Sequence, residues 1–142
     1  MQTFAEGLIG SAEISEDLRA EKIYEALRQL KKQKAIIGDL DNSPKARKPK
    51  TAEDLFNISK NPGALDRQAG CFELSALFVS LARVVGLQAV GVERVDPTGT
   101  GQIGHIMAGV RLADASILSI FDLQNETRGT RFRFRELSDP EF

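Results

Sequence analysis

One stretch, residues 70–86, constrains the fold more than any other part of the chain. It begins with Gly70-Cys71 and ends with Gly86. Apolar residues recur between them at helical spacing: Leu74, Leu77, Phe78, Leu81, Val84 and Val85. This pattern predicts an amphipathic helix with a buried stripe. Because glycine is a common helix stop directly after the last apolar turn, we expect the helix to end at Gly86.

After Gly86 the period of the apolar residues changes from helical to two, which predicts strands. The expected strands are residues 87–95, 105–112, 116–123 and 130–135. Val90 and Val92 should share one face of the first strand, and the phenylalanines of the last should face the core while its arginines face water. Loops are expected at residues 96–101, 113–115 and 124–129.

Before residue 70 the pattern is helical. Ser15 is the expected N-cap for a helix that runs to about Ile36. This helix has an apolar stripe and a charged face, which includes Lys31 and Lys32 and which we interpret as solvated. Residues 38–50 predict a loop, and Thr51 to Asp54 resemble a capping box that opens a short helix through about Ser59. Helices followed by a meander of strands predict an α+β fold, with the Cys71 helix packed across an antiparallel sheet of about four strands.

Length and composition exclude several classes of protein. A chain of 142 residues with a net charge of -1 predicts a single domain with no general attraction to nucleic acid or anionic membranes. One cysteine excludes an internal disulfide framework and a cysteine-based zinc site. We expect no membrane span and see no signal peptide, so a cytoplasmic location is the default, while an excised domain of an exported protein stays open.

Cys71, the single cysteine, falls on the first turn of the predicted helix. Unpaired N–H groups and the positive end of the helix dipole meet there, and they stabilise a thiolate. We therefore expect the pKa of this thiol to be lowered. The alternative is that Cys71 is a small buried apolar residue, as free cysteines often are.

His105, the single histidine, starts a strand directly after a glycine-rich loop, residues 99–104. The loop matches a dinucleotide fingerprint only formally, because a strand follows it where a nucleotide site needs a helix. If Cys71 is a nucleophile, His105 is the obvious base. A turn centred between Ala113 and Asp114 would place Asp122 directly opposite His105, on the same face, where a carboxylate can orient the imidazole.

At these residues the sequence resembles the transglutaminase-like branch of the papain-like thiol enzymes. The similar segments lie within residues 69–123: Ala69-Gly70-Cys71, Leu81-Ala82-Arg83-Val84-Val85-Gly86-Leu87, Gly104-His105 and Phe121-Asp122. The resemblance implies a papain-like cysteine proteinase fold over residues 1–142, with an N-terminal helix and loop at 1–50 and a catalytic core at 51–136. It also implies a Cys71–His105–Asp122 triad that acts on amide or peptide bonds through a thioester.

The resemblance implies no cofactor and no metal, and a protein or peptide as substrate. The Cys71 backbone N–H and Gln68 are the expected oxyanion donors. Where family members often carry tryptophan, this chain has Met107, and nothing identifies an amine site, so hydrolysis is favoured over crosslinking. The alternative is a catalytically inactive domain of the same family that binds a protein or peptide. The sequence does not define the oligomeric state.

Overall fold

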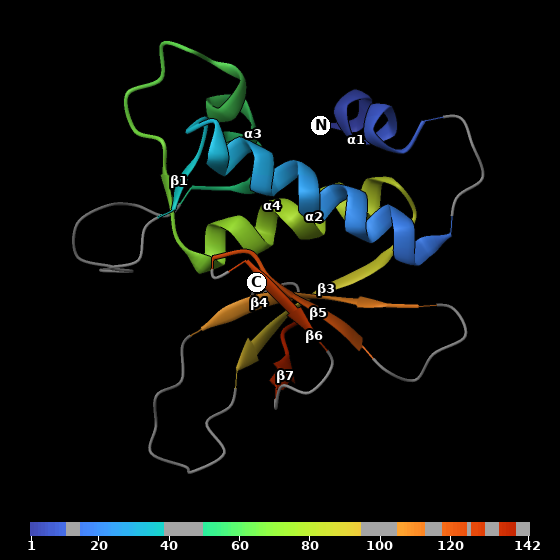
Figure 1. Ribbon diagram of the computed structural model, residues 1–142. Coiled ribbons are helices and arrows are strands. Elements are labelled where there is room, and N and C mark those ends of the chain that lie inside the picture. The colour runs from blue at the N-terminus through green and yellow to red at the C-terminus, as the bar shows by residue number, and fades with distance from the viewer. Residues whose placement is uncertain are drawn as a thin grey trace.

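The computed structural model has an α+β architecture, with helices on one side of an antiparallel sheet (Figure 1). It describes residues 1–10, 15–38, 50–94, 105–112, 118–124, 126–129 and 134–138. The helices of this described part are α1 (Gln2–Ile9), α2 (Glu16–Lys32), α3 (Ala52–Lys60) and α4 (Cys71–Val84). The predicted fold class is therefore confirmed.

The main sheet has five antiparallel strands in the order β6-β5-β4-β3-β7. They are β3 (Gln88–Arg94), β4 (Ile106–Arg111), β5 (Leu118–Asp122), β6 (Thr127–Gly129) and β7 (Phe134–Glu136). A separate parallel pair joins β1 (Ile37–Gly38) to β2 (Gln68–Ala69). The second pair matters for the site because β2 leads directly into α4.

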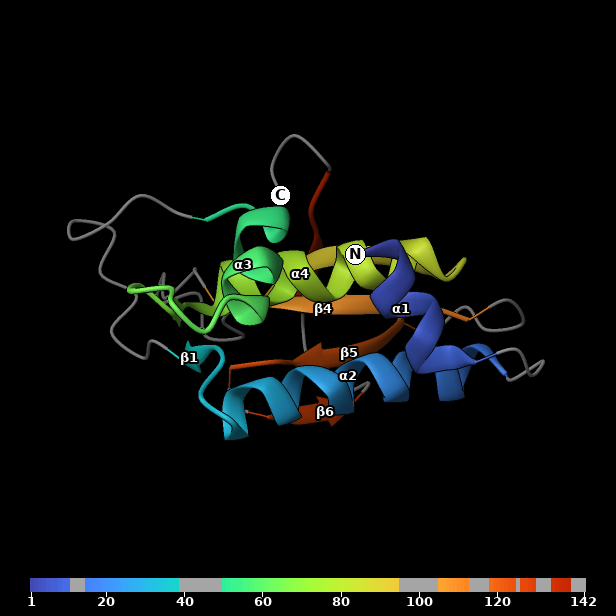
Figure 2. The same ribbon diagram turned by 90° about the horizontal axis from the view of Figure 1, so that it is seen from above.

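Helix α4 packs against β3 and β4 on one side and against the other helices on the other (Figures 1 and 2). The predicted stripe is fully buried at Leu74, Leu77, Phe78 and Leu81. Ring contacts extend the core across the layers, since Phe121 of β5 lies 5.0 Å from Phe78 and 5.3 Å from Tyr24 of α2, measured between ring centroids. The prediction that Val84 is buried is wrong, because this last helical residue borders a surface hollow and is 39% exposed.

The face of the sheet away from α4 carries a second, smaller cluster of buried residues: Val92, Met107, Leu118 and Ile120. Val90 packs against this cluster, so the prediction that Val90 and Val92 share a face is confirmed. Gly109 lies within the same layer, and a Cβ built on it would come 2.2 Å from Leu118 Cδ2. The strand therefore needs glycine here for packing.

Three helix ends follow the predicted capping chemistry. Ser15 Oγ accepts a hydrogen bond from the Leu18 N–H at 3.3 Å, and Thr51 with Asp54 forms the predicted capping box. Gly86 adopts a φ of 84°, the left-handed conformation that ends helices and favours glycine.

The predicted end of the second helix at about Ile36 is wrong. Helix α2 ends at Lys32, and Lys34 takes a positive φ of 59°. The N–H groups of Ala35 and Ile36 then both donate to Leu30 O, at 2.9 and 3.3 Å. This turn buries Ile36 fully and leaves the next two residues to form β1.

Four short elements were not predicted: α1, the paired strands β1 and β2, and β6. Helix α1 lies in a segment with few local signals, and β6 lies within the predicted loop at 124–129. A three-residue strand at the sheet edge is too short to show a period of two. The predicted strand at 130–135 corresponds to β7, in which Arg135 is exposed as predicted; residues 130–133 lie outside the described ranges.

The predicted loops at residues 96–101 and 113–115 also lie outside the described ranges, and so do residues 39–49 of the predicted loop at 38–50. Within those ranges, no helix combines the length and the apolar character that crossing a bilayer requires.

Candidate active site

Cys71 is the first residue of α4, and a network of polar contacts holds the backbone that leads to it. The carboxylate of Glu73 turns back and accepts a hydrogen bond from the Gly70 N–H at 3.1 Å. The same carboxylate accepts from the Lys50 N–H at 2.8 Å. Lys50 Nζ in turn donates to the Gln68 carbonyl at 2.9 Å. These contacts fix the direction in which the chain enters the helix.

His105 lies directly before β4, and its neighbour Ile106 is tied to α4. Ser75 Oγ donates to the Ile106 carbonyl at 3.3 Å, and Ser75 is fully buried. This contact places the beginning of β4 against the first turns of α4. The side chains of His105 and Cys71 are thereby close enough to form a hydrogen bond with each other.

Asp122 is the last residue of β5, and its carboxylate Oδ2 lies 2.6 Å from His105 Nε2. The Asp122 side chain is 6% exposed and that of His105 is 20% exposed. Since Nε2 contacts Asp122, the other ring nitrogen, Nδ1, is the one left for Cys71. The structure thus brings Cys71, His105 and Asp122 into one chain of hydrogen bonds, with His105 in the middle.

The predicted register between the two strands is wrong by two residues. In the structure Ala108 faces Phe121 and Val110 faces Ser119, so continuing the ladder places Asp122 opposite Met107 and not opposite His105. The residue numbers of each pair sum to 229, where the prediction required 227. Because side chains alternate with a period of two, His105 and Asp122 still share a face as diagonal neighbours.

The electrostatics of the three groups favour a charged pair. The hydrogen bond to Asp122, followed by that to Cys71, raises the pKa of His105 to about 9 against the opposing effect of burial. Burial raises the pKa of the Cys71 thiol, but the bond with His105 and contacts with the Ile106 and Phe72 backbone outweigh it, so that this pKa is lowered overall. Both shifts therefore act in the direction that stabilises imidazolium beside thiolate.

The expected oxyanion donors lie on both sides of Gly70. The Cys71 N–H belongs to the first turn of α4, where N–H groups have no partner within the helix. Gln68 lies on β2 and is exposed. Its carbonyl is held by Lys50 and its N–H donates to Asp66 Oδ1 at 3.1 Å, so its backbone is fixed. The role of the Gln68 amide stays a prediction.

Sequence reasoning missed the supporting residues Glu73 and Lys50. Glu73 could have been found, because a glutamate three residues after a predicted N-cap on an otherwise apolar helix face is a capping signal. It is only 4% exposed. Lys50 lies at the end of the predicted loop, and its role depends on partners far along the chain, which no local pattern shows.

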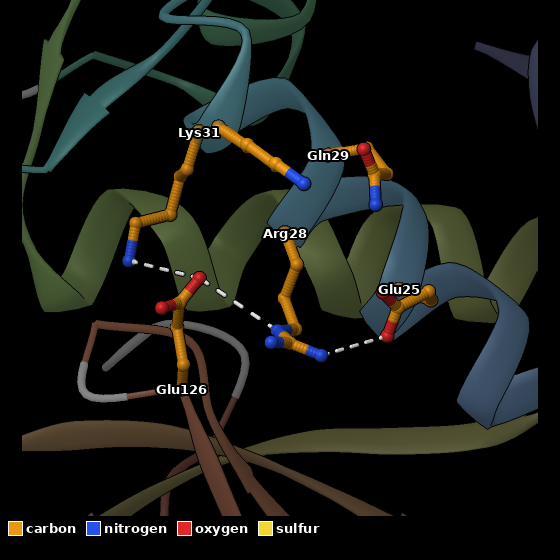
Figure 3. Close-up of a pocket in the computed structure, with 6 residues that line it drawn as sticks. Glu25, Arg28, Gln29, Lys31 and Glu126 are labelled. Atoms are coloured by element: carbon orange, nitrogen blue, oxygen red, sulfur yellow. Dashed lines mark hydrogen bonds and ion pairs between the residues drawn. The ribbon is translucent and has the colours of Figure 1, made fainter.

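The part of the chain that the structure describes contains no cluster of three or more His, Cys, Asp or Glu side chains that could hold a metal ion. Two of the surface hollows in this part have volumes of about 530 and 470 Å³. Neither is lined by Cys71, His105 or Asp122. The larger one borders the turn that follows Asp122 and is shown in Figure 3.

Comparison with known proteins gives a likeness of fold. No family model matches the chain, and no curated protein matches it in sequence. A crystal structure of a protein from Parabacteroides distasonis, described as "a putative protease", is similar over 91% of this chain, with a TM-score of 0.51 and 10% sequence identity. The chain spans 26% of that protein's length. At this identity the likeness concerns the fold.

Proposed function

We propose that this protein is a transglutaminase-like thiol hydrolase of amide or peptide bonds, with Cys71 as nucleophile, His105 as general acid and base, and Asp122 as the group that orients His105. The observation that carries the proposal is that the imidazole of His105 contacts both the Asp122 carboxylate, through Nε2, and the Cys71 side chain. The similarity of fold to the Parabacteroides distasonis protein is consistent with a peptidase and adds no residue roles.

The buried position of the carboxylate argues against a purely structural reading of the pair. An ionised carboxylate on a side chain that is 6% exposed is costly unless it is paired and hydrogen-bonded. A structural pair of Asp122 and His105 would not need a thiol in contact with the same imidazole. The thiol also stands at a helix N-terminus, where the dipole adds to the stabilisation of a thiolate.

In the proposed reaction the Cys71 thiolate attacks the carbonyl carbon of the substrate, and the carbonyl electrons move to oxygen. In this proposal the Cys71 N–H donates to the oxyanion and stabilises it. Collapse of this intermediate breaks the carbon–nitrogen bond, and His105 gives its proton from Nδ1 to the departing amine. A thioester remains on Cys71.

Water then resolves the thioester. Neutral His105 takes a proton from the attacking water, the carbon–sulfur bond breaks, and the carboxylic acid leaves while Cys71 and His105 return to the thiolate–imidazolium pair. Asp122 accepts from Nε2 throughout, which keeps Nδ1 directed at the sulfur. The proposal favours hydrolysis over crosslinking, because Met107 stands where tryptophan is common in the similar family and nothing in the sequence identifies an amine site.

The proposal is tested by the reactivity of Cys71, which is the only thiol in the chain. The rate of alkylation by iodoacetamide, measured against pH by intact mass, should titrate well below about 8.5, the usual value for a thiol. Helix position alone moves a thiol pKa by less than about one unit. His105→Ala should therefore move the profile most of the way back towards that of a free thiol.

Arg111→Gln is the matched control, because it removes a positive charge from β4 at an exposed position. Its alkylation profile should coincide with that of the wild type. A wild-type profile like that of a free thiol, or a Cys71 that reacts only in denaturant, would overturn the proposal. The peptide-binding alternative would then be the better account.

A further inference from the structure

The side chain of Lys31 leaves the last turn of α2 and ends at the turn that follows Asp122. Its Nζ donates to the carbonyl oxygens of Leu123 and Gln124, at 3.0 and 3.1 Å. The side chain is only 14% exposed. The prediction that Lys31 belongs to a solvated charged face is therefore wrong. Lys31 follows the buried Tyr24 by seven residues, which continues the buried stripe of α2.

The turn that Lys31 contacts is the loop of the β5–β6 hairpin. Asp122 pairs with Thr127, so the loop begins immediately after the carboxylate that contacts His105. Glu126, at the far end of the loop, has a positive φ of 56°. Its carboxylate lies 3.9 Å from Lys31 Nζ and 3.7 Å from Arg28 Nε (Figure 3). Helix α2 thus contacts the loop at both ends.

Lys31 also passes close to the segment that leads to Cys71. A Cβ built on Gly38 would lie 3.4 Å from Lys31 Cε and 3.8 Å from Nζ. Gly38 pairs with Ala69, two residues before Cys71. One partly buried lysine therefore lies between the strand pair that leads to the thiol and the hairpin that carries the carboxylate.

We propose that Lys31 is a positioning residue, which holds the turn after Asp122 through two carbonyl groups and so keeps the Asp122 carboxylate on His105 Nε2. The inference adds a positioning residue to the proposed active site, and it rests on the proposed function for the catalytic role of that site. Without the ammonium group, two carbonyl oxygens lose a charge-assisted donor, and the loop must rearrange to find water. Because Asp122 directly precedes the loop in the chain, its carboxylate moves when the loop rearranges.

A positioning role and a direct electrostatic role predict opposite signs. Removing a nearby positive charge, with nothing else changed, favours protonation and raises the pKa of His105. Loss of the Asp122 contact lowers that pKa, since this contact is the largest cause of its rise. A merely structural role would lower the melting temperature and leave the pKa of His105 in the folded protein unchanged.

The experiment is an NMR titration of the imidazole signals in the full chain, which contains a single histidine. Lys31→Met keeps the apolar stem and removes the donor. It should lower the pKa of His105 by at least about one unit. Lys32→Met is the matched control, because Lys32 is exposed on the rim of the same hollow. In Lys32→Met the pKa of His105 should stay within about 0.2 unit of the wild-type value, since solvent screens the charge of Lys32.

An unchanged or raised pKa in folded Lys31→Met would overturn the inference, and so would an equal fall in Lys32→Met. If Lys31→Met does not fold, Gly38→Val is measured instead, because its side chain crowds the Lys31 stem. The pKa of His105 should fall by the same amount in Gly38→Val, and an unchanged pKa in this variant overturns the inference. The titration requires no turnover, so a Cys71 that alkylates like a free thiol would defeat the proposed function while leaving the positioning result intact.

Discussion

The two ends of α4 are stabilised in different ways. At the C-terminal end the contacts are to the backbone: the Leu87 N–H donates to Ala82 O at 3.0 Å, and Arg19 Nη1 donates to Val85 O at 3.1 Å. The N-terminal end is capped by the buried carboxylate of Glu73, and two more buried ionisable side chains, Cys71 and Asp122, belong to the adjoining candidate site. The C-terminal end shows that this helix can be closed with a glycine and one partly buried donor, Arg19.

The N-terminal end holds more than closing a helix requires. Glu73 alone caps the Gly70 N–H. Burying a carboxylate, an imidazole and a thiol at the same place costs desolvation, which is offset only because each group has a partner. The comparison teaches that the excess of buried titratable groups, and not the helix end itself, marks the candidate site. It also predicts that substitutions at the N-terminal end change the free energy of unfolding by an amount that depends on pH. Substitutions at the C-terminal end should change it by the same amount at every pH.

Asp122→Asn should have the largest effect. It removes the main cause of the raised pKa of His105, which should fall from about 9 towards its ordinary value of 6.5. A group with a raised pKa in the folded state stabilises fully below its unfolded pKa, and this contribution is lost as pH rises through the folded value. The stability lost by the variant should thus be greatest below about pH 6.5, about 3 kcal/mol, and should shrink steadily between pH 6.5 and pH 9 until little of it remains above pH 9.

Urea unfolding between pH 6 and 10 measures this dependence. Glu25→Gln is the control, because that carboxylate is half exposed in an ion pair with Arg28 on α2. It should cost less than about 1 kcal/mol at every pH in the range. A difference between Asp122→Asn and the wild type that stays constant across the range would contradict the account of the charged pair.

Glu73→Gln should have an intermediate effect. Two backbone N–H groups, of Gly70 and Lys50, donate to the two oxygens of this carboxylate. An amide offers only one acceptor oxygen, so its NH₂ group must face the other donor. Because the group is buried, we expect a loss of about 2 kcal/mol in the free energy of unfolding. Glu53→Gln, at an exposed position in the first turn of α3, should change it by less than about 0.5 kcal/mol. Equal losses in the two variants would remove the special role of Glu73.

How far the sequence could predict these features depends on how local they are. The end of α4 at Gly86 and the caps at Ser15 and Thr51 follow from residues within one turn of each other, and the structure confirms them. The α+β class follows from the change of periodicity at Gly86. Helix α1 and strand β6 were missed because they are short and lack a clear period.

The three site residues could be named from the sequence because neither of the two observations used depends on the exact strand register. These observations are the alternation of side chains along a strand and the order of the three residues in the chain. Parity kept His105 and Asp122 on one face although the pairing differs by two residues. The resemblance supplied the order of the three residues. Lys31 and Lys50 could not be assigned, because their partners are backbone carbonyls distant in the chain, at Leu123 and Gln68. The residues next to a lysine in the sequence do not indicate whether its ammonium group is bound by water or by a distant backbone carbonyl.

The smallest effect is expected at the C-terminal end, from Gly86→Ala. A side chain there must adopt the left-handed conformation at a φ of 84°, although its Cβ would meet only Arg19 Nη1 at 3.8 Å. The cost should thus be conformational, about 1 kcal/mol, or roughly 3 °C in melting temperature, and the same at pH 6 and pH 10. Gly7→Ala in α1 is the matched control: nothing lies within 4 Å of its Cβ, and alanine is the better helix former, so it should stabilise slightly. Thermal unfolding of both variants at the two pH values measures the difference. A loss of melting temperature in Gly86→Ala that depends on pH would show that the two ends of α4 are coupled. It would contradict the conclusion that only the N-terminal end has ionisable groups that affect stability.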